Sequence, residues 1–259
     1  MDVFARVAGL PGVTESADSA RKVFDAMLWD RQLRASAEEV SRRSALAGAA
    51  SSAGIDGIEI EWRVWEAGQA ADDTAMGRAA GGIVAMYAQL PAVRPTWPSA
   101  PAQSLARLHT LVAVPVTPDD VGRPRADQPE DPLRLGLAPA ASDVPDRLTA
   151  LAVRMTRPTD APALVVAAVV HGELMTLQPF TYGSGLVARA VDRLVLGTRG
   201  VDPDNWSVPE AGLYAQGRPA YVRALREYAV GGVDGLSQWV QFYCRAVAAG
   251  TENVAALVG

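Results

Sequence analysis

The segment HGELMTLQPFTYGSGLVAR, residues 171–189, contains the turn on which the fold of this chain depends. The residues before it, 161–177, are apolar on nearly every side, which predicts a buried, central helix. Residues 183–185 read Gly-Ser-Gly, and a new helix is expected to begin near Leu186. Backbone N–H groups at such a helix N-terminus point into one concavity, which is the outline of an anion site.

The same turn also has a purely structural interpretation. Gly183 and Gly185 could serve the turn geometry alone, and Ser184 could cap the following helix. His171 and Cys244, each with apolar neighbours, read as residues that fill the core. The residues of the turn leave both interpretations open.

Composition excludes several classes of protein. The chain has 259 residues, of which 49% are hydrophobic and 20% charged, so it can bury a sizeable core. A net charge of -5 argues against a nucleic-acid or anionic-membrane binder, because both need clustered cations. The single cysteine permits neither an internal disulfide nor a cysteine-rich zinc site. No leader or spanning segment is visible, so we expect a soluble, cytoplasmic protein without membrane partners.

Helical periodicity dominates the chain and predicts a mainly α fold. Ser36 with Glu39 predicts a capping box that opens a helix ending near residue 54 or 57. Alternation in residues 58–62 predicts a short strand or extended segment. The proline-rich residues 92–101 predict a surface linker, which divides the chain into an N-terminal helical extension, 1–95, and a core domain, 96–259. Further helices are expected over residues 75–90, from 104, over 148–155, from 186, and in the regions of 221–228 and 236–243.

The turn resembles the signature of the Fic family, His-Pro-Phe-x-[Asp/Glu]-Gly-Asn-Gly-Arg-x-x-Arg. The family's structural residues are retained as Pro179, Phe180, Gly183, Gly185 and Arg189. Its reactive residues are replaced: the catalytic His by Gln178, the metal-binding acid by Tyr182, the Asn by Ser184 and the first Arg by Leu186. The family's second His, seven residues before the catalytic one, is matched by His171. The resemblance implies a helical bundle around a central buried helix–loop–helix.

Two outer segments extend the resemblance. Ser52, Asp56 and Gly57 resemble the family's inhibitory motif [Ser/Thr]-x-x-x-Glu-Gly, with a shorter acid, which implies a contact from Asp56 to Arg189. The alternative is a helix C-terminus with Gly57 as its cap and Asp56 solvated. Residues 115–140 form a long segment, of the kind that often serves as a lid, in which the family has a short β-hairpin that docks target segments by strand addition. Whether this chain forms the hairpin is left open.

The replaced residues predict the loss of family chemistry, which is transfer of AMP from ATP to protein hydroxyls. An amide such as Gln178 cannot accept a proton near neutral pH, and loss of a general base costs about 10²- to 10⁴-fold in rate. Tyr182 is a poor ligand for Mg²⁺, so we expect no metal. Leu186 lacks a charge stabiliser that can be worth on the order of 10³-fold in phosphoryl transfer.

Two functional hypotheses follow. In the first, the chain is a Fic-fold pseudoenzyme that binds a partner protein, and that binds ATP, another nucleotide or another anion at Gly183, Ser184, Gly185 and Arg189 without transfer. In the second, it is a nucleotidyl- or phosphoryltransferase of altered mechanism, in which Gln178 positions the acceptor. The second needs a base that the sequence does not identify.

Overall fold

The computed structural model describes residues 2–252, 254 and 255, and within these residues the fold is mainly α, as predicted. No strand is present in this part of the chain. The elements are α1 Val3–Ala8, α2 Val13–Trp29, α3 Arg31–Ala35, α4 Ala37–Ile55, α5 Trp62–Glu66, α6 Ala75–Ala88, α7 Leu90–Val93, the 3-10 turn η1 Arg94–Thr96, α8 Pro101–Ala113, the 3-10 turn η2 Ala141–Asp143, α9 Val144–Met155, α10 Ala163–Leu177, α11 Ser184–Thr198, α12 Pro209–Ala215, α13 Arg218–Val230 and α14 Gly232–Glu252.

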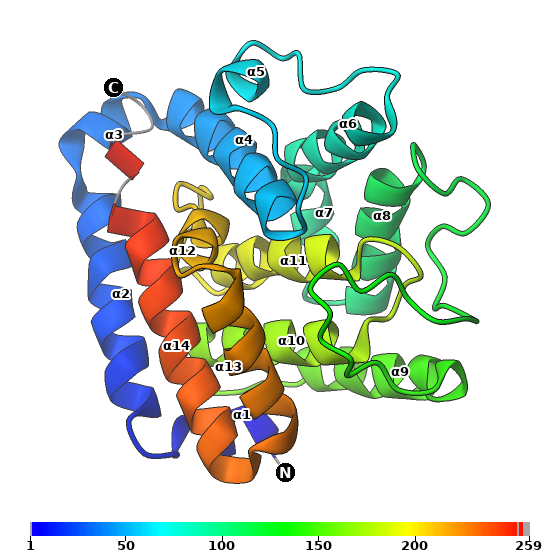
Figure 1. Ribbon diagram of the computed structural model, residues 1–259. Helices are drawn as coiled ribbons and strands as arrows, with labels where there is room; N and C mark the ends of the chain where they lie inside the picture. Colours follow the sequence, from blue (N-terminus) through cyan, green and yellow to red (C-terminus); the bar gives the residue numbers. More distant parts are fainter. Residues whose placement is uncertain (1, 253, 256–259) are drawn as a thin grey trace.

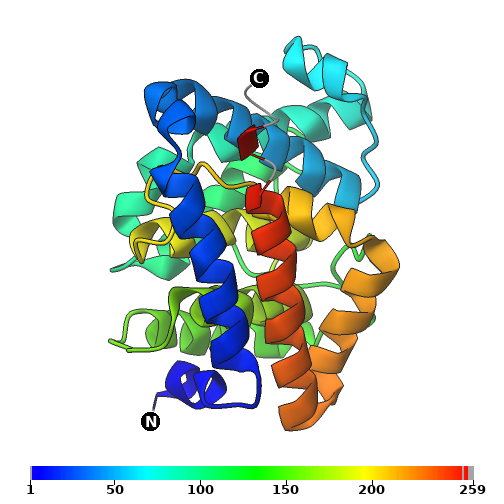
Figure 2. The ribbon, with the colours of Figure 1, turned by 90° about the vertical axis from the view of Figure 1, so that its left-hand side faces the viewer.

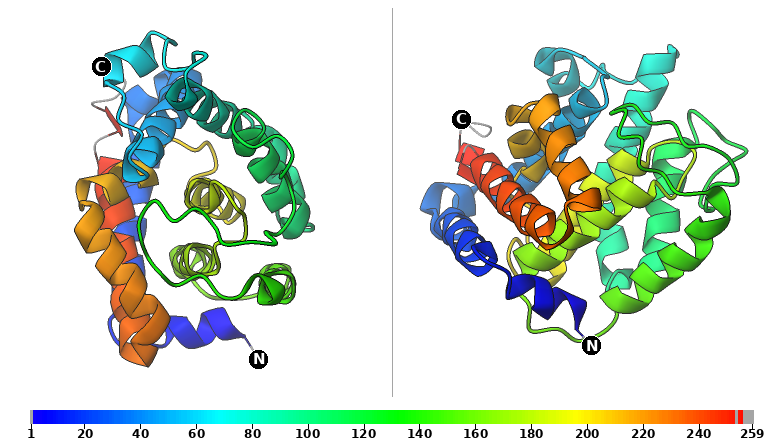
Figure 3. Two further views of the ribbon diagram at one scale, coloured as in Figure 1. Left: turned by 45° about the vertical axis from the view of Figure 1, so that its right-hand side comes forward. Right: turned by 60° about the horizontal axis from the view of Figure 1, so that its bottom comes forward.

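Two helices, α10 and α11, form the centre of the molecule (Figure 1). Nearly every residue of α10 is buried, which confirms the prediction of a central helix. The chain reverses through residues 178–183 and packs α11 against α10. The left view of Figure 3 looks almost along this pair, which lies between α13 and α14 on one side and α6 and α8 on the other. A helix without a polar face is stable in water only in such an enclosed position.

The N-terminal helices pack on the same core. Helix α2 lies beside α14 (Figure 2), and α4 contacts both α6 and α12. Phe24 on α2 and Val40 on α4 are buried in the same apolar cluster as α10 and α11. The predicted division at residue 95 stays a prediction, and helices from both sides of it share one core.

Two predictions for the N-terminal half differ in outcome. Residues 58–61 lie in neither a helix nor a strand; of the two predicted forms, a short strand or an extended segment, the strand is absent because no described segment pairs with them. The proline-rich residues 92–101 are not a surface linker: they form the end of α7, η1 and the start of α8, and Val93 and Trp97 are buried. Proline is compatible with the first turn of a helix, and three short helical segments use it in this position here.

The capping box is also wrong, although α4 begins where it was predicted. Ser36 is the N-cap residue, but its side chain makes no capping hydrogen bond. Glu39 pairs instead with Arg42, one turn further along. The helix is held by its buried face, which includes Val40, Ala49 and Ala53, and burial outweighs the lost cap.

Residues 115–140 run along the central turn without forming a hairpin or a free lid. The Arg125 N–H donates to the Pro179 carbonyl at 2.9 Å, and the Glu130 N–H donates to the Thr181 carbonyl at 2.7 Å. Leu133 and Leu135 are buried and anchor the segment. The segment contains six prolines, which have no N–H and therefore interrupt any ladder of strand pairing.

Candidate functional site

The turn between α10 and α11 is held in an unusual backbone conformation at both ends. Gln178, the C-cap residue of α10, has φ 44° and ψ 67°, a left-handed conformation that is uncommon outside glycine. Gly183, the N-cap residue of α11, has φ 73°. Such conformations persist only where the surroundings enforce them, and they are common at functional sites.

Arg125 enforces the conformation at Gln178. Its side chain is buried and donates from Nε to the Gln178 carbonyl at 2.7 Å, while Nη1 and Nη2 donate to the carbonyls of Asp127 and Pro139. Burial lowers the pKa of this guanidinium. The sequence analysis missed this role of Arg125, because carbonyl partners leave no pattern in the sequence.

On its other side the turn packs against α8. The rings of His109 and Phe180 are stacked, with centroids 3.9 Å apart and an interplanar angle of 7°. The Nδ1 atom of His109 accepts a hydrogen bond from the Gly122 N–H at 2.9 Å, so the ring proton lies on Nε2. Burial lowers the pKa of His109 to about 4. The imidazole is therefore neutral at pH 7, and its available lone pair is already used.

None of the four replaced positions offers a reactive group. Gln178 and Leu186 are buried, and the Gln178 Oε1 atom has no hydrogen-bond partner. Burial raises the pKa of Tyr182 to about 12, with further contributions from Asp56 and Glu130, so the phenol is neutral. The Ser184 hydroxyl accepts from the Phe180 N–H and donates to the Phe180 carbonyl. Ser184 lies inside the helix rather than at its cap, so the predicted capping role is wrong.

The other histidine is a core residue. His171 Nδ1 lies 2.8 Å from Asp192 Oδ2, and its Nε2 lies 2.5 Å from the Tyr221 hydroxyl, with all three side chains buried. Cys244 is buried as well, and burial raises the pKa of its thiol to about 12. Both predictions of core positions are confirmed.

Arg189 makes the contact that the inhibitory-type motif implies. Its Nη2 lies 2.8 Å from Asp56 Oδ2, and its Nε donates to Ser52 Oγ at 2.7 Å. Burial alone would lower the pKa of Arg189, but the Asp56 carboxylate reverses this effect and the net shift is upward. Gly57 follows with φ 88° at the end of α4. Asp56 is thus both at a helix C-terminus and paired, not solvated.

Several donors at the turn remain without an acceptor. The first hydrogen bond of α11 runs from the Val187 N–H to the Gly183 carbonyl, so the N–H groups of Ser184, Gly185 and Leu186 have no partner among the described residues. The Nη1 atom of Arg189 is buried and also lacks one. A Cβ atom placed on Gly185 would lie 3.1 Å from that Nη1 and 3.5 Å from Asp56 Oδ2. Free amides, the guanidinium and the carboxylate therefore converge beside Gly185.

In this structure the Asp56 carboxylate supplies the negative charge beside these donors. The N-terminus of α11 and Arg189 both favour negative charge. Among the described residues, no group of three or more His, Cys, Asp or Glu side chains could hold a metal ion. No described helix combines the length and the apolar character needed to cross a membrane.

Three solved structures of Fic proteins have a similar arrangement of helices. A Fic family protein from Desulfovibrio desulfuricans G20 superposes with a TM-score of 0.75 at 17% identity, over 95% of this chain and 74% of that one. The chain has the Fic fold. The Fic-1 segment from C. elegans matches with a TM-score of 0.74 at 17% identity, over 94% of this chain and 72% of that one. A Fic domain containing signaling protein from Bacteroides thetaiotaomicron matches at 0.66 and 12%, over 94% and 97% of the two chains.

No protein-family model matches the sequence of this Fic-fold chain, and no curated protein sequence matches it. The likeness to solved structures confirms the fold predicted from residues 171–189.

Proposed function

We propose that this chain is a Fic-fold pseudoenzyme: a regulatory or protein-binding module whose turn binds a nucleotide or another anion without transferring any part of it. One observation carries the proposal. The N–H groups of Ser184, Gly185 and Leu186 and the Nη1 atom of Arg189 have no partner among the described residues, whereas the four positions that would perform transfer hold buried side chains without a base or a metal ligand.

Catalysis by a substitute base has no support from the two histidines of the chain. His109 uses its lone pair at the Gly122 N–H, and His171 lies in the core between Asp192 and Tyr221. Of the nearby acids, Glu173 accepts from the Tyr228 hydroxyl at 2.6 Å, and Asp56 is engaged by Arg189. A general base must lie within hydrogen-bond reach of the proton it removes.

Asp56 controls access to the anion site. Its carboxylate neutralises Arg189 and lies beside Gly185, where an incoming phosphate would meet the free amides. An anion must therefore displace this carboxylate. Binding by wild-type protein is expected to be weak. The net free energy of binding is only the difference between the interactions that the anion makes at the site and those that the displaced Asp56 carboxylate made there.

Titration with ADP and ATP, with and without Mg²⁺, tests this proposal. Asp56→Asn removes the competing charge and is expected to tighten nucleotide binding about tenfold, the effect of one charge-assisted hydrogen bond. Arg189→Ala should abolish the binding. Glu59→Gln is the matched control, because it removes an exposed carboxylate that lies three residues away and makes no contact with Arg189. If Asp56→Asn binds neither nucleotide, the proposal that the turn binds a nucleotide is wrong.

The proposed absence of nucleotide transfer has its own test. Wild-type protein and Asp56→Asn are incubated with labelled ATP and a whole-cell lysate, and we expect no label on any protein. Labelling that disappears in Arg189→Ala would overturn the proposal in favour of a transferase of altered mechanism. Tighter binding in the presence of Mg²⁺ would contradict the expectation of a metal-free site. A partner protein stays a prediction, since no described contact specifies one.

A further inference from the structure

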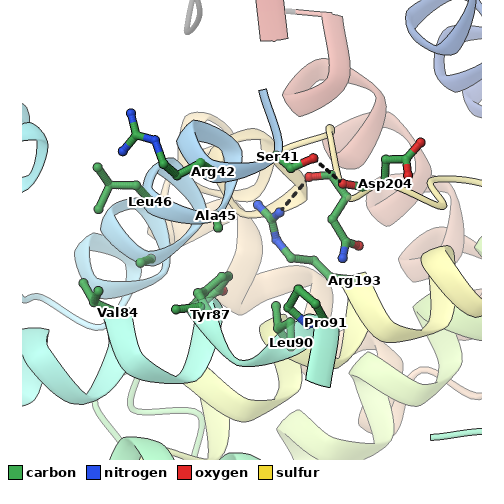
Figure 4. A pocket seen from close by; sticks show the side chains of 13 residues that line it. Ser41, Arg42, Ala45, Leu46, Val84, Tyr87, Leu90, Pro91, Arg193 and Asp204 are labelled. Carbon is green, nitrogen blue, oxygen red and sulfur yellow. Dashed lines mark hydrogen bonds between the residues drawn. The ribbon is translucent and has the colours of Figure 1, made fainter. Parts of the chain in front are cut away.

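A separate cavity of about 380 Å³ lies between α4 and the α6–α7 segment, away from the turn (Figure 4). Figure 4 shows Leu46 and Ala45 of α4 on one side, Val84 and Tyr87 of α6 on another, and Arg193 of α11 at the inner end. The remaining wall comes from Pro91 and from the connection at residues 204–205. This cavity plays no part in the proposed function.

Most of the wall is apolar, and its two cations, Arg42 and Arg193, are each paired with a carboxylate. The guanidinium of Arg193 donates from Nε and Nη2 to the two Glu210 carboxylate oxygens, at 2.8 and 2.9 Å. Its other donors reach the Ser44 hydroxyl, the Ser44 carbonyl and the Asn205 carbonyl. Arg42 donates from Nε and Nη2 to the two Glu39 carboxylate oxygens. Because both cations already have a carboxylate partner, the cavity does not favour an anionic ligand.

Two side-chain atoms of the lining residues are buried without a hydrogen-bond partner, the Tyr87 hydroxyl and the Asn205 Oδ1, and only the second is an acceptor that cannot also donate. Asn205 lines the cavity, and its side-chain oxygen Oδ1 is buried without a hydrogen bond to any described residue. Asn205 has φ 53°, and its backbone carbonyl is held by Arg193, which fixes the residue in place. An unpaired buried amide oxygen costs free energy, which a donor on a ligand would recover.

We propose that this cavity is a binding site for a small, uncharged, mainly apolar molecule that carries one N–H or O–H donor. The apolar part packs against Leu46, Val84 and Pro91, and the donor bonds to Asn205 Oδ1. The size is suitable, because an apolar cavity of about 150 Å³ already accommodates a benzene-sized molecule. Cavities of about 300 Å³ and above are common for small-molecule ligands in proteins.

The test compares two probes of equal shape. Indole has a ring N–H donor, and benzofuran has an oxygen acceptor in the same position. With ¹⁵N-labelled full-length protein, NMR titration is expected to shift the signals of residues around the cavity, with a Kd for indole on the order of 1 mM or tighter. Indole should bind about tenfold more tightly than benzofuran, the effect of one hydrogen bond.

Three variants separate the cavity from adventitious binding. Asn205→Gly keeps the left-handed backbone and should make the two probes bind equally. Ala45→Phe narrows the cavity and should abolish binding. Ala45 is only partly exposed, so a phenylalanine at this position also affects folding. Ala88→Trp, at an exposed position of the wall, therefore provides a second variant with a blocked cavity. Ala85→Trp, exposed on the same helix but outside the wall, should leave binding unchanged.

The proposal is overturned if wild-type protein binds neither probe at the limit of solubility. It is also overturned if Asn205→Gly retains the preference for indole, or if indole binds both blocked variants as it binds wild type. None of these outcomes affects the test of nucleotide binding at Arg189, so either proposal can be wrong while the other holds.

Discussion

Two arginines of α11, Arg189 and Arg193, lie one turn apart, and both bond to serines of α4, yet their surroundings differ. Arg193 forms a two-pronged pair with Glu210, and all of its donors have acceptors. Arg189 has one contact to Asp56, and its Nη1 atom and the Asp56 Oδ1 atom both lack partners. The Glu210 side chain is fully buried, whereas that of Asp56 is 8% exposed.

This difference matters for the proposed function, in which only the incomplete pair exchanges its partner. A buried ion pair that is complete cannot exchange its partner without leaving a charge unpaired, which is strongly unfavourable. The incomplete pair at Arg189 has a spare donor, three amides without a partner beside it, and a carboxylate whose side chain is 8% exposed. In the proposed function a ligand anion replaces that carboxylate, and the charge of Arg189 stays compensated throughout.

The largest effect is expected from breaking the complete pair. Glu210→Gln keeps the shape of the side chain but leaves Arg193 charged and unpaired, and should lower the free energy of unfolding by about 3–5 kcal/mol. Asp56→Asn should lower it by only about 1–2 kcal/mol, because an anion from the buffer can reach Arg189. Urea unfolding of both variants checks this. Equal losses would show that the two pairs do not differ.

A smaller effect is expected from glycines beside the two arginines. A Cβ on Gly48 would overlap the Arg193 guanidinium and lie 2.9 Å from Glu210 Oε2. Gly48→Ala should therefore destabilise the fold by about 1–3 kcal/mol, although alanine is the better helix former.

Gly185→Ala is the matched substitution at the other arginine. Its Cβ would lie 3.1 Å from Arg189 Nη1, which can shift, so stability should change by less than about 1 kcal/mol. Placed in an Asp56→Asn background, the same methyl group should weaken ADP binding, because it occupies the space in front of the amides. If Gly185→Ala leaves ADP binding by Asp56→Asn unchanged, the anion does not bind at the amides beside Gly185.

A further effect depends on pH and concerns the stacked rings of His109 and Phe180, which hold the turn. The pKa of His109 is about 4 in the folded protein and about 6.5 in the unfolded chain. Between these values only the unfolded chain binds the proton, so the free energy of unfolding should fall as pH falls from 6.5 to 4, by up to roughly 1.4 kcal/mol per pH unit. Urea unfolding across this range should show a shallower slope for His109→Gln. An identical slope would mean that His109 does not contribute.

Sequence patterns predicted the parts of the molecule in which local and global preferences agree. The apolar helix α10, the glycine turn and the apolar face of α11 could all be predicted, because a buried helix and a sharp turn each need particular residue types. The Asp56 to Arg189 contact could be predicted only through the spacing of a known motif.

Other features depend on partners that are distant in the chain. Glu210 lies in a passage that reads as irregular, and nothing local connects it with Arg193 or Gly48. Residues 58–62 alternate as a strand does, but a strand needs a neighbour, and none of the described segments is in position. The prolines of residues 92–101 suggested a linker, whereas packing of Val93 and Trp97 against the core holds them in helical turns.

The sequence by itself determined the helical bundle, its central helix–turn–helix and the side-chain types that the turn presents at Gln178, Tyr182, Ser184 and Leu186, because periodicity and side-chain chemistry are local properties. Only the tertiary structure decided which of two neighbouring arginines is fully paired, which donors stay free beside Gly185, and that a cavity with an unpaired amide opens under α4. These depend on long-range packing, in which partners separated by tens to hundreds of residues meet, and no short window of sequence contains both members of such a pair.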